Sequence, residues 1–189
     1  MKKIILSIIA LIVVVFLIPV LLTTKFENTN TEEQTEEGIS SISTYNYEEY
    51  NNIQLLHAKT GEIEELNIDE YLYRVVSAEI PSSFELEAIK AQAIAARTYT
   101  IYKIKNNDGK HGAIGICDNS TCCQAYISKE DRLAKWSEEE RQKNWDKIVQ
   151  AVDTTKGKII TYNNEPINAF FHANSGGVTE IPTNVWVRK

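Results

Sequence analysis

Hydrophobic and polar positions divide the chain into three parts. Residues 4–22 form an apolar run without a charge, and residues 27–52 are polar, with seven Glu and no Lys or Arg. From residue 53 onward, apolar residues either alternate with polar ones or recur at helical spacing. Alternation indicates half-buried strands and helical spacing indicates amphipathic helices, so we expect the hydrophobic core in this third part.

Two helices are predicted near the middle of the folded part, separated at Pro81. Asp69 is the expected N-cap of the first helix, and Val75 and Val76 lie on its apolar face. The residue before a proline is disfavoured in the α region, so this helix should end near Ile80.

The second helix should begin at a capping box formed by Ser82 and Glu85, and its Ala-rich run extends over residues 86–104. A third helix is expected over residues 137–155, again with capping-box spacing at its start.

Short hairpins are predicted on both sides of these helices. The expected strand pairs are residues 53–56 with 63–66, and residues 158–162 with 167–172. A loop rich in Gly, Asn and Asp occupies residues 106–122. The order of strands, helices and strands predicts an α+β fold, with short β-hairpins around a central helix pair.

The apolar run near the N-terminus has the length of a membrane-spanning helix, because its 19 residues extend over roughly 28 Å. Lys2 and Lys3 precede it, which predicts a cytoplasmic N-terminus and an extracytoplasmic remainder. A cleaved signal peptide is the alternative, but residues 23–26 offer no Ala-x-Ala-like cleavage site. We therefore expect a single-pass cell-membrane protein with residues 1–25 as anchor, residues 26–52 as a flexible acidic tether and residues 53–189 as the extracytoplasmic domain.

The net charge of −6 comes mainly from the tether. Residues 53–189 contain 19 acidic and 17 basic residues, a balance of −2. A nearly neutral folded part gives no indication of nucleic-acid binding.

Glu79 is expected in the last turn of the first helix, beside Ile80 and Pro81. The negative end of the helix dipole and the poorly hydrating neighbours both disfavour a carboxylate, so we expect a raised pKa for Glu79. A raised pKa suits an acid that donates a proton near neutral pH. The alternative is an exposed Glu at a helix end without a chemical role.

Three residues of the loop have the chemistry of zinc ligands. His111, Cys117 and Cys123 follow one another at intervals of six residues. This is not a standard zinc-finger spacing, and the fourth ligand is left open between water, an acidic residue and His172. A disulfide between Cys117 and either Cys122 or Cys123 is the alternative.

Residues 172–180 follow the last expected strand and carry further polar groups. His172 and Ser175 offer hydrogen bonds, and the paired Gly176 and Gly177 allow a polymer to approach the backbone closely. Ser175 is not in a Gly-x-Ser-x-Gly elbow, which favours a substrate-contact loop over a nucleophile. An ordinary turn is the remaining alternative.

Several of these segments, taken in order, resemble the stage II sporulation protein D family over residues 53–186. The resemblance is carried by Glu70-Tyr71-Leu72, Val75-Val76-Ser77-Ala78-Glu79-Ile80-Pro81, Lys90-Ala91-Gln92-Ala93, Ala95-Ala96-Arg97-Thr98-Tyr99 and Ser175-Gly176-Gly177-Val178-Thr179-Glu180.

The resemblance implies a lytic transglycosylase that cuts peptide-free peptidoglycan between N-acetylmuramic acid and N-acetylglucosamine during spore engulfment. It implies Glu79 as the catalytic residue and His111, Cys117 and Cys123 as ligands of a structural Zn²⁺, without an organic cofactor. The implied partners are glycan strands, the membrane, and the amidase and membrane protein of the engulfment complex.

This activity needs one carboxyl group. Protonated Glu79 would protonate the glycosidic oxygen, and the sugar's own C6 hydroxyl would trap the oxocarbenium-like centre as a 1,6-anhydro product. A glycoside hydrolase would need a second carboxylate. Arg97 and Tyr99 are expected on the second helix, where they would orient Glu79 or the substrate; a structural ion pair is the alternative for Arg97.

The family continues well beyond residue 186, so we expect that a C-terminal part of the substrate groove is missing from this chain. Two alternative functions are therefore considered beside the transglycosylase. One is a non-catalytic wall-binding or amidase-modifying protein, because related amidase-enhancer proteins share these motifs. The other is a zinc hydrolase, which needs a metal with an open coordination position.

Overall fold

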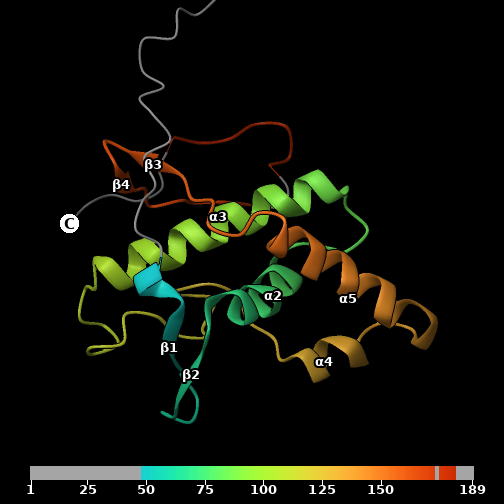
Figure 1. The fold of residues 1–189 in the computed structure, drawn as a ribbon, viewed down its shortest axis with the longest axis horizontal. Coiled ribbons are helices and arrows are strands. Elements are labelled where there is room, and N and C mark those ends of the chain that lie inside the picture. The colour runs from blue at the N-terminus through green and yellow to red at the C-terminus, as the bar shows by residue number, and fades with distance from the viewer. Residues whose placement is uncertain (1–47, 173–174, 182–189) are drawn as a thin grey trace, which may run out of the picture. The chain divides into compact units, whose positions relative to one another are not determined.

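The computed structural model describes residues 48–172 and 175–181, and helices dominate the regular structure of this part (Figure 1). In chain order the elements are η1 (Glu48–Tyr50), β1 (Asn52–Leu56), β2 (Ile63–Asn67), α2 (Ile68–Glu79), α3 (Leu86–Lys105), α4 (Lys129–Ala134), α5 (Glu138–Asp153), β3 (Thr161–Tyr162) and β4 (Glu165–Pro166). Mixed helices with short antiparallel hairpins confirm the outline of the predicted α+β class.

The predicted membrane anchor lies outside the described residues. Within the described ranges, no helix is both long enough and apolar enough to cross a bilayer. Described structure begins at η1, inside the stretch expected as a tether, where the side chain of Tyr50 is buried. The carbonyl of Asn51 accepts a hydrogen bond from the N–H of Ile68 at 2.9 Å, so folded structure begins before residue 53.

Helix α2 ends where the sequence predicts, although it begins two positions early. Asn67, not Asp69, is the N-cap: its side-chain oxygen accepts a hydrogen bond from the backbone N–H of Asp69 at 2.9 Å. The expectation for Asp69 was wrong because its carboxylate is buried in an ion pair instead. At the other end, Ile80 has the extended backbone that Pro81 imposes, and the last helical residue is Glu79.

Helix α3 begins at Leu86, and the predicted capping box at Ser82 is not formed. Glu85 occupies the N-cap position without a side-chain cap bond. The intervening residues turn instead, because the N–H of Phe84 donates to the carbonyl of Pro81 at 3.1 Å.

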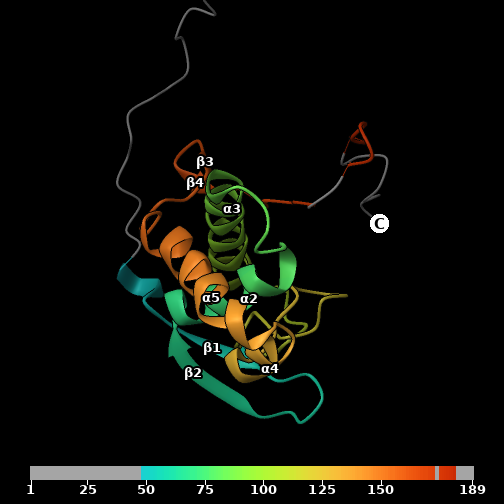
Figure 2. The ribbon, with the colours of Figure 1, turned by 90° about the vertical axis from the view of Figure 1, so that its right-hand side faces the viewer.

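Helices α2, α3 and α5 surround one hydrophobic core, and Figure 2 views α3 nearly end-on with the other two beside it. Its fully buried members include Leu72, Val75, Val76, Ile89, Ala93, Ile101, Ile148, Ala151 and Val152. Burial of each large aliphatic side chain contributes about 1.5–3 kcal/mol. The three helices thereby hold the end of α2 in a fixed place.

Both expected hairpins are present. In the first, β1 and β2 pair antiparallel, with Ile53 opposite Leu66. In the second, β3 and β4 pair only two residues each, and Asn163 and Asn164 turn the chain with φ of 50° and 63°. Two central residues with positive φ are typical of a two-residue hairpin. The second strand is thus residues 165–166 and not 167–172.

Helix α4 was not predicted, and α5 fits the expected third helix. Ser137 is the N-cap residue of α5, but its hydroxyl donates to the carboxylate of Glu140 at 2.9 Å and makes no cap bond to the backbone. The helix ends at Asp153, two residues before the predicted end.

Candidate active site and metal centre

Glu79 is the last residue of α2, and its carboxylate is half-buried. One oxygen, Oε1, accepts a hydrogen bond from the backbone N–H of Ala125 at 2.6 Å. Among the described residues, no Lys, Arg or His side chain forms an ion pair with Glu79. Its second oxygen is therefore left for another donor or acceptor.

Glu79 lines a cavity of about 680 Å³, a volume typical of small-ligand sites. Three parts of the chain form the other walls. Helix α3 contributes Tyr99, Tyr102 and Lys103, and the segment after β4 contributes residues 168–171. The loop of residues 106–124, called the cysteine loop below, contributes residues 106, 108, 110 and 120–124. Aromatic and polar side chains thus surround Glu79.

Four side chains meet at the edge of this cavity. The donor atoms of His111, Cys117, Cys122 and Cys123 all lie within 4.8 Å of one another. The Sγ of Cys122 lies 3.0 Å from the Sγ of Cys117 and 3.7 Å from Nε2 of His111. The Sγ of Cys123 lies 3.4 Å from the same nitrogen. The predicted ligands come together, and Cys122, which was left out of the predicted set, joins them.

These four donors fit a zinc ion. Tetrahedral coordination with the usual Zn–S and Zn–N lengths places ligand atoms roughly 3.3–3.8 Å apart. The two distances from Nε2 of His111 fall in that range, the 3.0 Å between Cys117 and Cys122 is shorter, and all four atoms lie within 4.8 Å of one another. The alternative of a disulfide is not formed, since all three cysteines are free. Sequence spacing did not single out Cys122, because two adjacent cysteines are ambiguous until the loop is folded.

The two thiols on the outer side of the cluster are held in their protonated form. Burial is the main cause that raises the pKa of Cys123 to about 12; the backbone N–H of Cys117 opposes the rise and the thiol of Cys117 adds to it. Burial, followed by the hydrogen bond with Cys117, also raises the pKa of Cys122. A divalent cation at the centre would reverse both effects, because thiolates bind metal and thiols do not.

The cluster and Glu79 are joined through the chain that follows the cysteines. Ala125, whose N–H binds Glu79, comes two residues after Cys123. Between them, the buried amide of Gln124 donates to the hydroxyls of Thr100 and Tyr71 at 2.9 and 3.3 Å. The position of the donor to Glu79 therefore depends on the cysteine loop and on its packing against α2 and α3.

The loop is also tied to the first hairpin. Leu56 donates to the carbonyl of Ile116 and accepts from the N–H of Asp118, both at 3.1 Å, so the segment around Cys117 runs beside β1. Next to it, the ring of His57 lies between the carboxylates of Asp118 and Glu64. These contacts give His57 a structural partner on each side.

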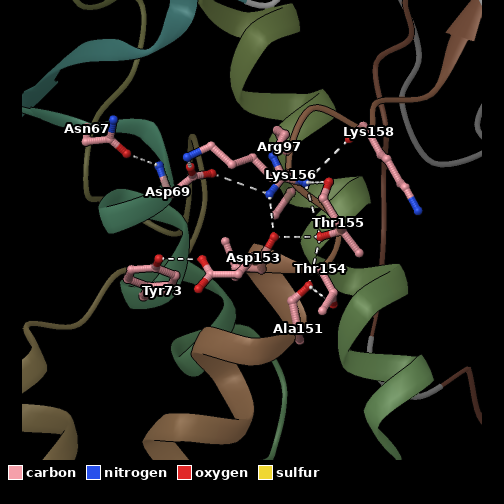
Figure 3. Close-up of polar contacts among 12 residues, drawn as sticks. Asn67, Asp69, Tyr73, Arg97, Ala151, Asp153, Thr154, Thr155, Lys156 and Lys158 are labelled. Atoms are coloured by element: carbon pink, nitrogen blue, oxygen red, sulfur yellow. Dashed lines mark hydrogen bonds and ion pairs between the residues drawn. The ribbon is translucent and has the colours of Figure 1, made fainter.

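Arg97 lies inside the protein and not on the cavity wall. Its guanidinium donates to the carbonyls of Val152 and Thr155 at 3.1 and 2.8 Å, at the end of α5 (Figure 3). Nη2 lies 3.6 Å from Oδ1 of Asp69, whose other oxygen pairs with Lys156 at 2.9 Å. Of the two roles considered for Arg97, these contacts favour the structural one.

Tyr99 does line the cavity with Glu79, and its hydroxyl reaches the carbonyl of Cys122 at 3.5 Å. Burial, reinforced by the nearby cysteines, raises the pKa of Tyr99 to about 12. Tyr99 is thus a neutral hydrogen-bonding group at neutral pH. Its place beside Glu79 is compatible with the predicted substrate contact.

The last predicted contacts lie away from this cavity. His172 is exposed and lines a separate apolar hollow with Phe84 and Phe171. Ser175 accepts a hydrogen bond from the N–H of Gly177 at 3.2 Å in an exposed turn. In the described part of the chain, neither Ser175 nor the glycines at 176 and 177 line the cavity of Glu79, and their substrate contact stays a prediction.

Comparisons with known proteins agree with this arrangement. The family model described as stage II sporulation protein, SpoIID, matches residues 56–162. Stage II sporulation protein D of Bacillus subtilis (strain 168) and that of Bacillus amyloliquefaciens are each 38% identical over 125 residues, which cover 66% of this chain and 36% of each relative. The amidase enhancer of Bacillus subtilis is 33% identical over 112 residues, or 59% of this chain and 13% of that protein.

The chain thus spans about a third of the length of the sporulation proteins that it matches. The family match extends over more than half of the chain and includes Glu79 together with the whole metal cluster. The chain therefore belongs to the stage II sporulation protein family, SpoIID.

Proposed function

We propose that this protein is a lytic transglycosylase that cleaves peptide-free glycan strands of peptidoglycan, with Glu79 as its acid and base. The observation that carries the proposal is the state of this carboxylate. One oxygen is oriented by a backbone N–H, no ion pair neutralises it within the described residues, and it faces a cavity of about 680 Å³. Such a group is free to exchange a proton with a bound saccharide.

The reaction uses the same carboxyl group twice. Protonated Glu79 gives its proton to the glycosidic oxygen as the bond to the muramic acid C1 breaks. The C6 hydroxyl of that sugar then attacks C1, and the carboxylate takes the hydroxyl proton. The products are a 1,6-anhydro end and a free N-acetylglucosamine end, and Glu79 is protonated again.

A second carboxylate is present in the cavity wall, but it is engaged elsewhere. Asp108 is bound by the ammonium groups of Lys103 and Lys110 at 3.3 and 3.5 Å. The backbone N–H of Lys110 is the main cause that lowers the pKa of Asp108, and Lys103 adds to it. A hydrolase would need a second carboxylate free to attack or to activate water, so the lone-acid reaction is favoured.

We propose a structural role for zinc, held by His111, Cys117, Cys122 and Cys123. When bound, the ion supplies a crosslink between parts of the loop. Four protein donors leave no open coordination position, which is typical of structural sites and unfavourable for a zinc hydrolase. The residues themselves keep the N–H of Ala125 directed at Glu79.

The location and the partners are part of the same proposal. The apolar run at residues 4–22 would anchor the protein in the cell membrane, with the domain on the extracytoplasmic side, where glycan strands lie. The likeness to an amidase enhancer supports a working relation with a cell-wall amidase, which would strip the peptides first.

Mass spectrometry of glycan digests tests the activity. The wild-type protein should release products with 1,6-anhydro ends from peptide-free glycan, and Glu79→Gln should lower their rate of formation by at least about a thousandfold, because it cannot donate the proton. Asp108→Asn is the matched control in the same cavity and should keep most of the activity. Equal product formation by wild type and Glu79→Gln would contradict the proposal.

A non-catalytic wall-binding protein is the second candidate. The likeness to the amidase enhancer favours it. Binding of peptide-free glycan with no cleavage by the wild-type protein would select this alternative.

A further inference from the structure

Glu79 also lines a second hollow, of about 470 Å³. Its walls include Pro81 after α2, Arg132 on α4 and Trp136, which follows α4. A protein that cuts a polymer has to bind sugar residues on both sides of the bond it breaks. Glu79 belongs to the walls of two separate spaces, which is the arrangement this requires.

Arg132 is a cation without an anion. Its Nε is shielded from solvent and has no hydrogen-bond partner, and no carboxylate lies within ion-pair distance of its guanidinium in residues 48–172 and 175–181. Arg97, although more deeply buried, donates to two carbonyls and has Asp69 beside it. The contrast indicates that Arg132 has no anionic partner among the described residues.

The position of this guanidinium is nevertheless fixed. Its central carbon lies 5.0 Å from the centre of the Trp136 ring, a cation–π arrangement that restricts the side chain. Burial lowers the pKa of Arg132. An arginine still stays protonated at neutral pH, so a bound anion would stabilise this charge.

We propose that Arg132 and Trp136 form a subsite, next to Glu79, for a sugar residue that carries a carboxylate. A guanidinium binds a carboxylate through two parallel hydrogen bonds, and an indole ring offers an apolar face to a sugar. The inference deepens the proposed function, on which it rests, by naming the residue that selects the substrate.

Peptidoglycan contains a sugar whose carboxylate such a subsite could bind. N-acetylmuramic acid has a lactyl group whose carboxyl is an amide while a peptide is attached and a free carboxylate once the peptide is removed. Arg132 would therefore distinguish stripped strands from intact ones. A carboxylate on the stem peptide itself has the same chemistry and is the other source to be tested.

Isothermal titration of the full-length protein carrying Glu79→Gln, which does not consume the ligand, tests the subsite. The ligands are a peptide-free tetrasaccharide of alternating N-acetylglucosamine and N-acetylmuramic acid, the same tetrasaccharide with its peptides, and neutral chitotetraose. The peptide-free ligand should bind roughly tenfold or more tightly than chitotetraose, because a charge-assisted bidentate contact is gained.

Adding Arg132→Gln should abolish this preference, and an unchanged melting temperature would report an intact fold. Lys135→Gln, which removes an exposed charge from the same segment, is the matched control and should keep the preference. Tighter binding of the peptide-bearing ligand that is lost with Arg132→Gln would support the subsite and assign the carboxylate to the peptide. Equal affinity for all three ligands, or a preference that survives Arg132→Gln, would overturn the subsite.

The outcome is independent of turnover. A wild-type protein that binds the acidic tetrasaccharide through Arg132 but forms no anhydro products would contradict the proposed reaction and leave the subsite standing. Formation of anhydro products by a protein whose binding does not depend on Arg132 would support the proposed reaction and contradict the subsite.

Discussion

His57 links two parts of the molecule through its charge state. Nδ1 lies 3.0 Å from a carboxylate oxygen of Asp118, and Nε2 lies 3.2 Å from one of Glu64. The hydrogen bond with Asp118 is the largest cause that raises the pKa of His57, and Glu64 adds to it against a smaller effect of burial. Arg74 and Tyr126 hold Glu64 in turn, at 3.0 and 3.2 Å. The imidazolium form is thus stabilised by the fold.

A raised pKa in the folded state has a definite consequence for stability. The contribution of His57 to the free energy of unfolding is fully present below the pKa that His57 has in the unfolded chain. It is lost as the pH rises through the higher pKa of His57 in the folded protein. His57→Gln should therefore lower the free energy of unfolding at about pH 6 by up to about 1 kcal/mol and by less at about pH 9. Urea denaturation of both proteins at the two pH values measures the difference; an equal loss at both would contradict it.

Local sequence rules predicted the positions of some residues well and the contacts of others not at all. The end of α2 at Glu79 follows from Pro81, two positions away, and the structure confirms it. The contacts of Arg97 depend on Val152, 55 residues further along, and no local pattern reports them. Glu79 was therefore placed correctly at its helix end, while the two roles of Arg97 were separated only by the fold.

At the scale of elements, the cysteine loop packs tightly against α3 at one glycine. Gly115 has a φ of 79°, and a Cβ there would lie 3.1 Å from the Cα of Ile104 and 3.3 Å from the carbonyl oxygen of Lys103. Both are backbone atoms of a helix, which cannot move aside cheaply. The loop that carries the metal ligands is thus fitted to α3 at this point.

Gly115→Ala should lower the free energy of unfolding by about 2 kcal/mol or more, because strain at positive φ and a backbone clash add up. Gly109→Ala separates the two effects, since Gly109 has a φ of 76° with nothing within 4 Å of the added Cβ. It should lose only about 1 kcal/mol. Chemical denaturation gives both values, and equal losses would show that the close approach to α3 does not matter.

Helix α4 shows the limit of pattern-based prediction for elements. Its six residues include four charged ones and none that is fully buried, so its sequence has no apolar stripe that would predict a helix. The signal that was available is Ser128, whose hydroxyl accepts a hydrogen bond from the N–H of Asp131 at 3.0 Å. The helix carries Arg132, so missing it also meant missing the second hollow beside Glu79.

At the scale of the whole domain, the loop that carries His111 and the three cysteines connects elements that are distant in the sequence. The cysteine loop runs along β1, packs on α3 and delivers the N–H of Ala125 to the end of α2. Elements that are distant in the sequence are therefore fixed relative to Glu79 by one loop. Removal of the proposed zinc ion is therefore expected to displace the N–H that binds Glu79, without any chemical step at the ion.

Cys122→Ser tests whether the cluster is closed by a fourth protein ligand. The variant should bind zinc roughly tenfold or more weakly than wild type, with a lower melting temperature, because one thiolate is lost. Competition with a zinc-binding dye measures the affinity, and Ser120→Ala in the same loop is the control. Unchanged affinity would show that water or another group takes the fourth position.

The hydrogen bond that orients Glu79 comes from a main-chain atom. Every amino acid except proline supplies that N–H, so the side chain at position 125 is open to drift during evolution while the interaction persists. An alignment would then not show which residue orients the carboxylate of Glu79. The sequence of the cysteine loop would group the relatives of this protein more reliably than the amino acid at position 125.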